Sequence, residues 1–222
     1  MYKSWIITLC AIAVSACGHA TSGASMQTET LHHAAETNDV AKISQLLSEK
    51  APIDARDLSG ATALLVAPHE NNVDVAKALI ETGADVNAKD LIQDSPYLYA
   101  GARGHLEILK MTLQHGADLK STNRYGGTAL IPAAERGHVE TVRILIQAGV
   151  DVNHINNLGW TALMEAVVLG DGSQKYLDII NLLIQAGADV NIPDREGVTA
   201  LKHAQERHYS AIEKALLNAG TK

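Results

Sequence analysis

The chain has 222 residues, of which 46% are hydrophobic and 19% are charged, and its mean hydropathy is close to zero. These proportions are typical of folded proteins with one or two domains and exclude a low-complexity or disordered chain. The net charge of -7 comes without a cluster of basic residues, which argues against binding to nucleic acid, since such binding depends on lysine and arginine at the phosphates.

The N-terminal segment is typical of an export signal. One early lysine precedes an apolar run from Trp5 to Val14, which is too short to span a bilayer, and small residues follow it. We predict a signal peptide over residues 1–16. The two cysteines are Cys10, in the apolar run, and Cys17, so the folded part has no thiol to mispair in an oxidising compartment.

The stretch VSAC, which ends at Cys17, resembles the bacterial lipobox of one aliphatic residue, two small residues and a cysteine. This resemblance implies that the chain is cut before Cys17 and that the thiol then receives a lipid. The alternative is ordinary cleavage a few residues later, for example after Ala20 or Ala24. We predict a linker over 17–28 and a location in the periplasm, either lipid-anchored to the outer membrane or soluble.

From residue 29 onward the sequence repeats itself. One marker is a glycine in similar segments, such as TGADVNA and AGADVNI, at Gly83, Gly116, Gly149 and Gly187. A second marker recurs with spacings of 33, 33, 33 and 38 residues, at Leu64, Tyr97, Leu130, Leu163 and Leu201. Extrapolation backward by the same period reaches Leu31. Two markers with one period and one shared insertion indicate a stack of similar structural units.

The repeated segments resemble the ankyrin repeat, in which D-x-x-G-x-T-P-L-H-x-A-A precedes a Gly-His pair, an apolar helix and G-A-D-V-N-A. The resemblance implies an all-α solenoid of helix-turn-helix units with finger-like β-turn loops. Because one unit cannot bury its apolar face alone, stability is expected to come from contacts between neighbours. We divide the ankyrin repeat domain, residues 29–222, into units at 29–56, 57–89, 90–122, 123–155, 156–193 and 194–222.

The fourth unit illustrates the elements that we expect in each. Thr128 is the predicted N-cap of a short first helix, and Gly137 is placed to end it in the left-handed conformation. The second helix is predicted to end at Gly149. Its apolar face follows the spacing of an amphipathic helix, with Val139, Val142, Leu145 and Ile146.

Some units depart from this pattern. Pro68 falls late in the first helix of the second unit, where Asn71 and Asn72 also replace Gly-His, so we expect this unit to be the least regular. Pro132 lies nearer its cap and is expected to do less harm. In the third unit the segment LIQD replaces the usual turn glycine, and the extra residues of the fifth unit are predicted to form a loop around 169–176.

The histidines and carboxylates of the repeats are assigned to the scaffold. His105 and His138 each follow a glycine, and in ankyrin repeats this imidazole bonds backbone groups between units. Asp85 and Asp118 occupy a repeat position that is expected to face solvent and to bond local backbone. Equivalent histidines would lie on helices about 8–10 Å apart, too far apart to share a metal ion. With no nucleophile elbow or phosphate-binding motif present, we predict no catalytic residue, no metal site and no cofactor.

Function is expected at positions that the repeat leaves free. Ankyrin-like stacks bind partners through a concave face made of finger tips and first helices. Mapped onto this chain, the predicted partner-binding residues are Leu58, His69, Leu91, Ile92, Arg103, Arg124, Tyr125, Arg136, Leu158, Trp160 and Leu169. Large apolar residues at finger tips are unusual and indicate a binding surface, unless some tips pack on one another.

The leading hypothesis is a non-catalytic, monomeric protein-binding module that is exported to the bacterial envelope. It would bind one protein partner through its concave face, either to inhibit an enzyme, as an immunity protein does, or to position an envelope component. Contact with the membrane would be limited to the lipid anchor. The alternatives are a metal-dependent hydrolase that uses the histidines, and a cytoplasmic ankyrin protein whose N-terminus is a misread helix.

Overall fold

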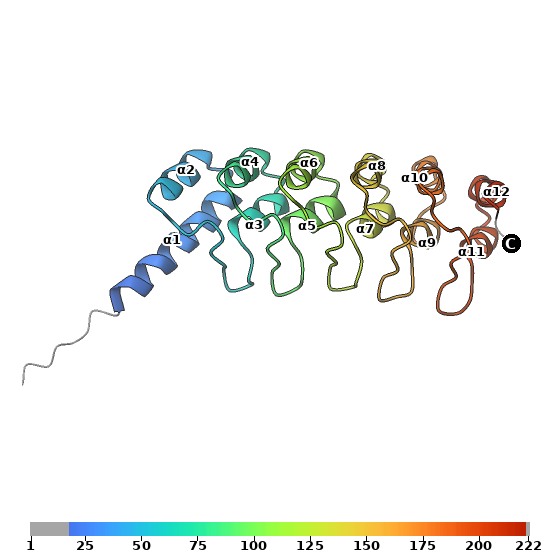
Figure 1. The fold of residues 1–222 in the computed structure, drawn as a ribbon, viewed down its shortest axis with the longest axis horizontal. Coiled ribbons are helices and arrows are strands. Elements are labelled where there is room, and N and C mark those ends of the chain that lie inside the picture. Colours follow the sequence, from blue (N-terminus) through green and yellow to red (C-terminus); the bar gives the residue numbers. More distant parts are fainter. Residues whose placement is uncertain (1–17, 221–222) are drawn as a thin grey trace, which may run out of the picture.

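The computed structural model describes residues 18–220, with side chains from residue 26 onward. The predicted signal peptide and Cys17 lie outside the described residues. Over residues 18–220 the chain forms six consecutive pairs of α-helices (Figure 1). They are α1 (Gly18–Glu36), α2 (Val40–Ser48), α3 (Ala63–His69), α4 (Val73–Glu81), α5 (Pro96–Arg103), α6 (Leu106–Gln114), α7 (Leu130–Glu135), α8 (Val139–Ala148), α9 (Ala162–Val168), α10 (Gln174–Gln185), α11 (Ala200–Glu206) and α12 (Ser210–Asn218).

The helices form two layers. Odd-numbered helices pack on one another along the inner layer, and even-numbered helices do the same along the outer layer. The loops before α3, α5, α7, α9 and α11 all project to the same side (Figure 1). We call these loops fingers; they comprise residues 57–61, 90–94, 123–127, 156–160 and 194–198. The arrangement confirms the predicted all-α solenoid.

The second sequence marker forms the core of the inner layer. Its side chains are buried at Leu31, Leu64, Tyr97, Leu130 and Leu163. Leu201, in the final pair, is only half-buried, because no further pair covers it within the described residues. Apolar burial of this kind between neighbouring pairs supplies most of the stabilisation of a solenoid.

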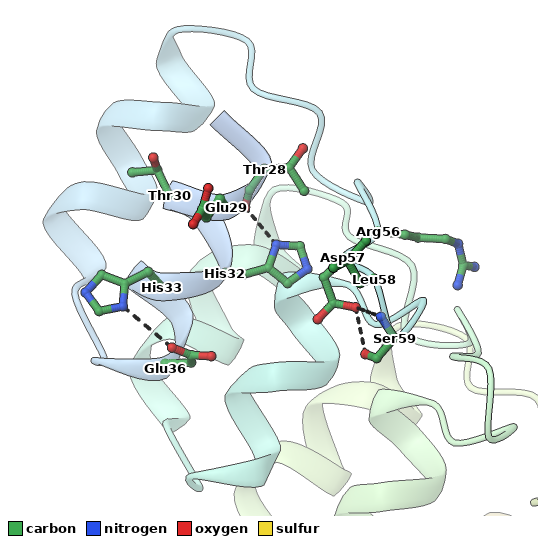
Figure 2. A pocket seen from close by; sticks show the side chains of 10 residues that line it. All are labelled: Thr28, Glu29, Thr30, His32, His33, Glu36, Arg56, Asp57, Leu58 and Ser59. Atoms are coloured by element: carbon green, nitrogen blue, oxygen red, sulfur yellow. Dashed lines mark hydrogen bonds and ion pairs between the residues drawn. The ribbon is translucent and has the colours of Figure 1, made fainter. Parts of the chain in front are cut away.

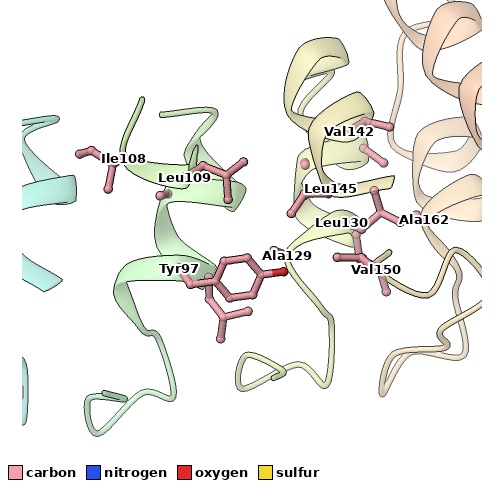
Figure 3. Packing of buried hydrophobic residues seen from close by; sticks show 14 of the residues in the cluster. Tyr97, Ile108, Leu109, Ala129, Leu130, Val142, Leu145, Val150 and Ala162 are labelled. Atoms are coloured by element: carbon pink, nitrogen blue, oxygen red, sulfur yellow. The ribbon is translucent and has the colours of Figure 1, made fainter. Parts of the chain in front are cut away.

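The third and fourth units approach each other closely (Figure 3). A Cβ atom at Gly101 would lie 2.8 Å from the Cβ of Ala129, so only glycine allows α5 and α7 to pack at this distance. The ring of Tyr97 points toward Ala129 in the same interface (Figure 3). Its hydroxyl is buried and has no hydrogen-bond partner among the described residues.

Each finger is held by its first residue. The side-chain oxygen of Asp57 accepts hydrogen bonds from the backbone N–H groups of Ser59 (2.8 Å) and Ala61 (3.0 Å). The same pair of bonds recurs in every later finger, with acceptors at Asp90, Asn123, Asn156 and Asp194. These short polar side chains therefore give the finger tips a fixed backbone conformation.

Backbone hydrogen bonds also join some fingers to each other. The N–H of Leu91 donates to the carbonyl of Ser59 (3.0 Å), and the N–H of Asn157 donates to that of Tyr125 (2.8 Å). The second finger is thus bonded to the third and the fourth to the fifth. Among residues 18–220, no backbone bond joins the third finger to the fourth.

The predicted cap at Thr128 is wrong. In four other units the cap side chain accepts a bond from the residue three positions on, as Thr62 does from the N–H of Leu65 (3.2 Å). Thr128 Oγ1 is buried and lacks a hydrogen-bond partner in the described part of the chain. Pro132 has no N–H to donate to the Thr128 carbonyl, so α7 begins at Leu130, two positions after Thr128; the N–H of Ile131 bonds that carbonyl at 3.2 Å but does not bond Oγ1.

Consequently the prediction that Pro132 would do less harm than Pro68 is also wrong. Helix α7 has six residues, the fewest of the described helices, and its N-cap position is Ala129, which makes no side-chain bond. Helix α3, which contains Pro68, has seven residues and keeps its cap. A proline in the last turn of a helix leaves the first-turn bonds intact, whereas one at the fourth position after the cap removes a first-turn donor.

The histidines that follow Gly104 and Gly137 do not make the backbone bonds that the resemblance implied. Among the described residues, the imidazole rings of His105 and His138 make no hydrogen bond to backbone; the His138 ring packs over Gly104. Bonds between the loops of neighbouring pairs come from other residues. Asn72 Nδ2 donates to the carbonyl of Ala35 (2.8 Å), and the hydroxyls of Tyr176 and Tyr209 donate to Glu135 and Gly170 (2.9 Å each).

Two further segments differ from expectation in detail. Residues 18–28, expected as a linker, are helical and continuous with the rest of α1. The insertion of the fifth unit is shared between a loop and a helix: residues 169–173 separate α9 from α10, and α10 has 12 residues where α8 has 10. In contrast, the predicted local bonds of Asp85 and Asp118 are confirmed, since their carboxylates accept from the N–H of Asn87 and Lys120.

Candidate functional site

A groove runs along the face that the finger tips and the C-terminal ends of the inner helices form together. It spans the second to fifth units and has a volume of about 620 Å³. Eight of the predicted partner-binding residues line it: His69, Ile92, Arg103, Arg124, Tyr125, Arg136, Leu158 and Leu169. His69 and Leu169, which are 100 positions apart in sequence, are therefore brought to one surface by the stacking of units.

The apolar members of the groove are well exposed. Ile92 and Leu158 each expose 50% of their surface, Tyr125 exposes 55% and Leu169 exposes 49%. Ile92, Tyr125 and Leu158 are finger-tip residues, whereas Leu169 follows α9. Exposed apolar side chains that share one groove with polar neighbours are typical of a binding surface.

Three predicted residues lie elsewhere. Leu58 is fully exposed on the second finger and lines a separate cavity. Leu91 is exposed but lies against Gly60 of the preceding finger, so this tip packs on its neighbour, which was the alternative for such residues. Trp160 is half-buried and packs against the core, because it occupies the returning limb of its finger, where Asn156 bonds both its N–H and its carbonyl.

Aromatic and cationic side chains meet in the middle of the groove. The rings of His69 and Tyr99 are stacked, with their centroids 4.1 Å apart. The guanidinium carbon of Arg103 lies 5.3 Å from the centre of the Tyr99 ring, and that of Arg124 lies 4.8 Å from the Tyr125 ring. These contacts hold the arginine planes against aromatic faces.

A buried carboxyl forms part of the groove floor. Glu165, on α9, has 4% of its surface exposed, and its Oε1 accepts a hydrogen bond from Asn156 Nδ2 at 2.8 Å. Burial raises the pKa of Glu165 to about 7, and the nearby Glu135 adds to this effect, while Asn156 and Arg136 oppose it. The groove therefore contains an acid that changes charge near neutral pH.

A second carboxyl in the groove is less deeply placed. Asp94, at the end of the third finger, is half-buried. Burial raises its pKa above the usual range, and Asp90 adds to the increase, whereas Arg124 and His69 oppose it. Both Asp94 and Glu165 are thus less exposed than the arginines of the groove.

The sequence analysis missed Tyr99 and Glu165 as groove residues. Each lies four positions after the N-cap residue of its unit, and the same position holds Val66, Pro132 and His203 in other units. The next position is alanine in all five units, whereas this position changes its chemistry from unit to unit. That variability was the available signal, because a position free to vary cannot be needed for packing alone.

A separate cavity of about 1130 Å³ lies at the N-terminal end of the stack (Figure 2). The His32 ring lies between Thr28 and the second finger, and its nitrogens are 2.8 Å from the Thr28 carbonyl and 2.9 Å from the Ala61 carbonyl. On the second finger, the Ser59 hydroxyl donates a hydrogen bond to the Asp57 carboxylate (Figure 2). The polar groups here are engaged in joining α1 to the second unit.

Two other kinds of feature are absent from the described residues. No group of three or more histidine, cysteine, aspartate or glutamate side chains there is arranged to hold a metal ion. None of the helices in that part of the chain is both long and apolar enough to cross a membrane.

Comparisons with known proteins agree with the architecture. A family model described as ankyrin repeats in three copies matches residues 9–90 and 97–194. The crystal structure of an ankyrin repeat domain from Acinetobacter baumannii is 66% identical, covers 86% of this chain and 98% of that one, and has a TM-score of 0.85. Another, described as an ankyrin repeat protein, is 45% identical, with coverage of 88% and 98% and a TM-score of 0.82. No curated protein matches the chain.

Proposed function

This chain belongs to the ankyrin repeat family, and from that premise we propose that it is a non-catalytic module that binds one protein partner through the groove. The observation that supports the proposal best is the set of exposed apolar side chains, Ile92, Tyr125, Leu158 and Leu169, gathered with three arginines along one groove. Aromatic and arginine side chains are the most frequent sources of binding energy at protein interfaces.

The backbone that carries these side chains is suited to rigid presentation. The tip residues Tyr125 and Leu158 each donate their N–H to the first residue of their own finger, Asn123 and Asn156, at 2.9 Å. A preformed tip loses little conformational entropy when a partner binds. We therefore expect the groove backbone to change little on binding, with adjustments limited to side-chain rotamers.

We further propose that the module works in the bacterial periplasm, where a lipid on Cys17 holds it to the outer membrane. This part of the proposal rests on the export pattern and the VSAC stretch of the sequence. There the module would act as a monomer that inhibits an enzyme or positions an envelope component.

Cross-linking tests the groove as the binding surface. A photoreactive amino acid at position 169 should capture a discrete protein from envelope extract of the native host. Tyr125→Ala combined with Leu158→Ala should abolish this capture while the melting temperature stays nearly unchanged, because both side chains are exposed. Leu217→Ala is a matched control, since Leu217 is also 50% exposed but lies on α12, outside the groove. Equal capture by the double variant would contradict the proposal.

Labelling tests the anchor separately. Cells that express the full chain and are fed a labelled fatty acid should incorporate the label into the protein, and Cys17→Ser should abolish it. A processed but unlabelled chain would indicate the soluble periplasmic alternative. An unprocessed chain would contradict export altogether.

A further inference from the structure

Three arginines in the groove are held in place by groups other than carboxylates. Arg103 and Arg124 lie over the rings of Tyr99 and Tyr125, and Arg136 Nη1 donates to the carbonyl of Ala102 at 2.7 Å. All three are exposed. Among the residues that the structure describes, none of the three forms an ion pair.

Some cations on the outer layer are paired with carboxylates along one helix. Lys110 Nζ lies 2.9 Å from a Glu107 carboxylate oxygen, and Arg143 Nε lies 3.2 Å from one of Glu140. The chain has 25 acidic residues and 18 lysines and arginines, so acids are available to pair with every cation. Arg56 and Arg195 also bond carbonyl oxygens rather than carboxylates, so the groove is distinguished by three exposed arginines that line one surface together with exposed apolar side chains.

The acids of the groove lie deeper than its arginines. Asp94 and Glu135 are half-buried and Glu165 is buried, whereas the arginines are exposed. A ligand that approaches the groove thus meets guanidinium groups at the rim before it reaches a carboxylate on the floor. Because a guanidinium presents its N–H donors as a planar fork, it matches a carboxylate better than it matches most other groups.

We infer that the groove binds an acidic, extended segment of the protein partner, whose carboxylates bond Arg103, Arg124 and Arg136 while its apolar side chains contact Tyr125 and Leu158. This inference rests on the proposed function and specifies the chemistry of the partner. Arg136 uses Nη1 for the Ala102 carbonyl, and its other N–H groups are available for the ligand. The positive charges of the three arginines complement the carboxylates of the segment. This complementarity sets the orientation of the segment and favours acidic over basic partners.

The floor carboxyl makes this recognition depend on pH. The charged groups that act on Glu165 are Glu135 and Arg136 from α7, and Asn156 of its own finger is its hydrogen-bond donor. Of its other neighbours, α10 carries Lys175 and Tyr176, and α11 carries His203, which is paired with Asp194 at 2.7 Å. A charged Glu165 repels an acidic segment and a protonated one does not, so affinity should rise as the pH falls from about 8 to about 6.

Peptide binding to the purified chain tests the inference. The probe is a dodecapeptide that repeats glutamate, leucine and aspartate, and its counterpart carries lysine at every acidic position. We expect the acidic peptide to bind and the basic one not to, even though the net charge of the protein is -7. Each of Arg103→Gln, Arg124→Gln and Arg136→Gln should weaken binding about tenfold, as expected for the loss of one charge-assisted hydrogen-bonded pair.

A triple variant of the outer layer is the matched control. The triple groove variant combines Arg103→Gln, Arg124→Gln and Arg136→Gln. The control combines Lys77→Gln, Lys110→Gln and Arg143→Gln, which removes the same positive charge from exposed positions outside the groove. This control should keep the affinity within about twofold at physiological salt, because exposed charges that far from the ligand are screened. Equal losses in the two triple variants would overturn the inference, since binding would then follow net charge alone.

The pH dependence provides a readout that general attraction does not. Glu165→Gln should bind at pH 8 as tightly as the unmodified chain binds at pH 6, and His69→Gln should retain the pH dependence because the Glu165 carboxyl is intact. Tighter binding of the basic peptide would overturn the inference in favour of recognition by the floor carboxyls. If the groove binds inorganic phosphate but does not bind the acidic peptide, the inference is also overturned.

The cross-linked complex separates this inference from the proposed function. If the groove variants abolish capture of the partner but the acidic peptide does not displace it, the inference fails and the proposed function stands. If capture persists in the Tyr125→Ala, Leu158→Ala variant, the proposed function fails and the peptide measurements alone decide the inference. Displacement of the partner by the acidic peptide, and not by the basic one, supports both.

Discussion

The groove and the outer layer differ in the pairing and burial of their polar side chains. On the outer layer, exposed charges pair along one helix, as Arg143 does with Glu140. In and beside the groove, arginines are unpaired, Glu165 is buried, and Gln93 has a φ of 67°, where the next finger has glycine. The outer layer thus keeps these paired charges at the surface, while the groove holds a carboxyl out of water. Such a cost is expected where a surface is kept for binding rather than for stability.

The largest effect should come from removing the buried charge. Because burial raises the pKa of Glu165 to about 7 from 4.5, the folded chain holds this proton more tightly than the unfolded chain, and stability falls as the pH rises between these values. Glu165→Gln keeps an acceptor for Asn156 but has no charge. It should stabilise the chain by about 2–3 kcal/mol at pH 8 and by nearly nothing at pH 4. Urea unfolding at both pH values measures the difference; an equal effect at both would contradict a buried charge.

Relief of backbone strain should have a smaller effect. Gln93 occupies the turn position that holds Gly60, Gly126, Gly159 and Gly197 in other fingers, all with positive φ. Gln93→Gly should stabilise the chain by about 1 kcal/mol, because a left-handed conformation is costly for a residue with a side chain. The reverse substitution, Gly197→Gln, is the matched control, since no atom lies within 4 Å of an added Cβ there. It should cost a similar amount in thermal or urea unfolding.

The smallest effect is expected on the outer layer. Arg143→Gln breaks an exposed ion pair with Glu140, and such pairs contribute about 0.5 kcal/mol or less. The change in unfolding free energy should be near the limit of measurement and should vanish at high salt. If it equalled the effect of Glu165→Gln, the contrast between the two surfaces would be lost.

Most of the fold could be predicted because the repeat restates the same information in each unit. Leu31 was located only by extrapolation of the period, and it is buried in α1 at the expected place. Prediction failed at Thr128, where the N–H of Ile131 bonds the Thr128 carbonyl and leaves Oγ1 without a partner in the described part of the chain, and where Pro132 delays the start of α7. Whether a side chain caps a helix depends on the geometry of the whole first turn, and the identity of one residue does not specify that geometry.

Prediction of the groove was partial for a geometric reason. Tip residues such as Tyr125 and Leu158 were found because the two positions after the first finger residue point outward in every unit. Trp160 was misplaced because it lies on the returning limb, where its side chain meets the core. Glu165 was missed because depth along the inner helix depends on how neighbouring units stack, which no single repeat shows.

The pairwise bonding of the fingers divides the row of tips in the groove. Lys89 Nζ donates to the Thr122 carbonyl at 2.7 Å at the base of the third and fourth fingers, while no backbone bond joins their tips among the described residues. The separation of Ile92 from Tyr125 therefore depends on the packing of α5 on α7, where Gly101 lies against Ala129. A small residue in the inner layer thus helps to set the width of the binding surface.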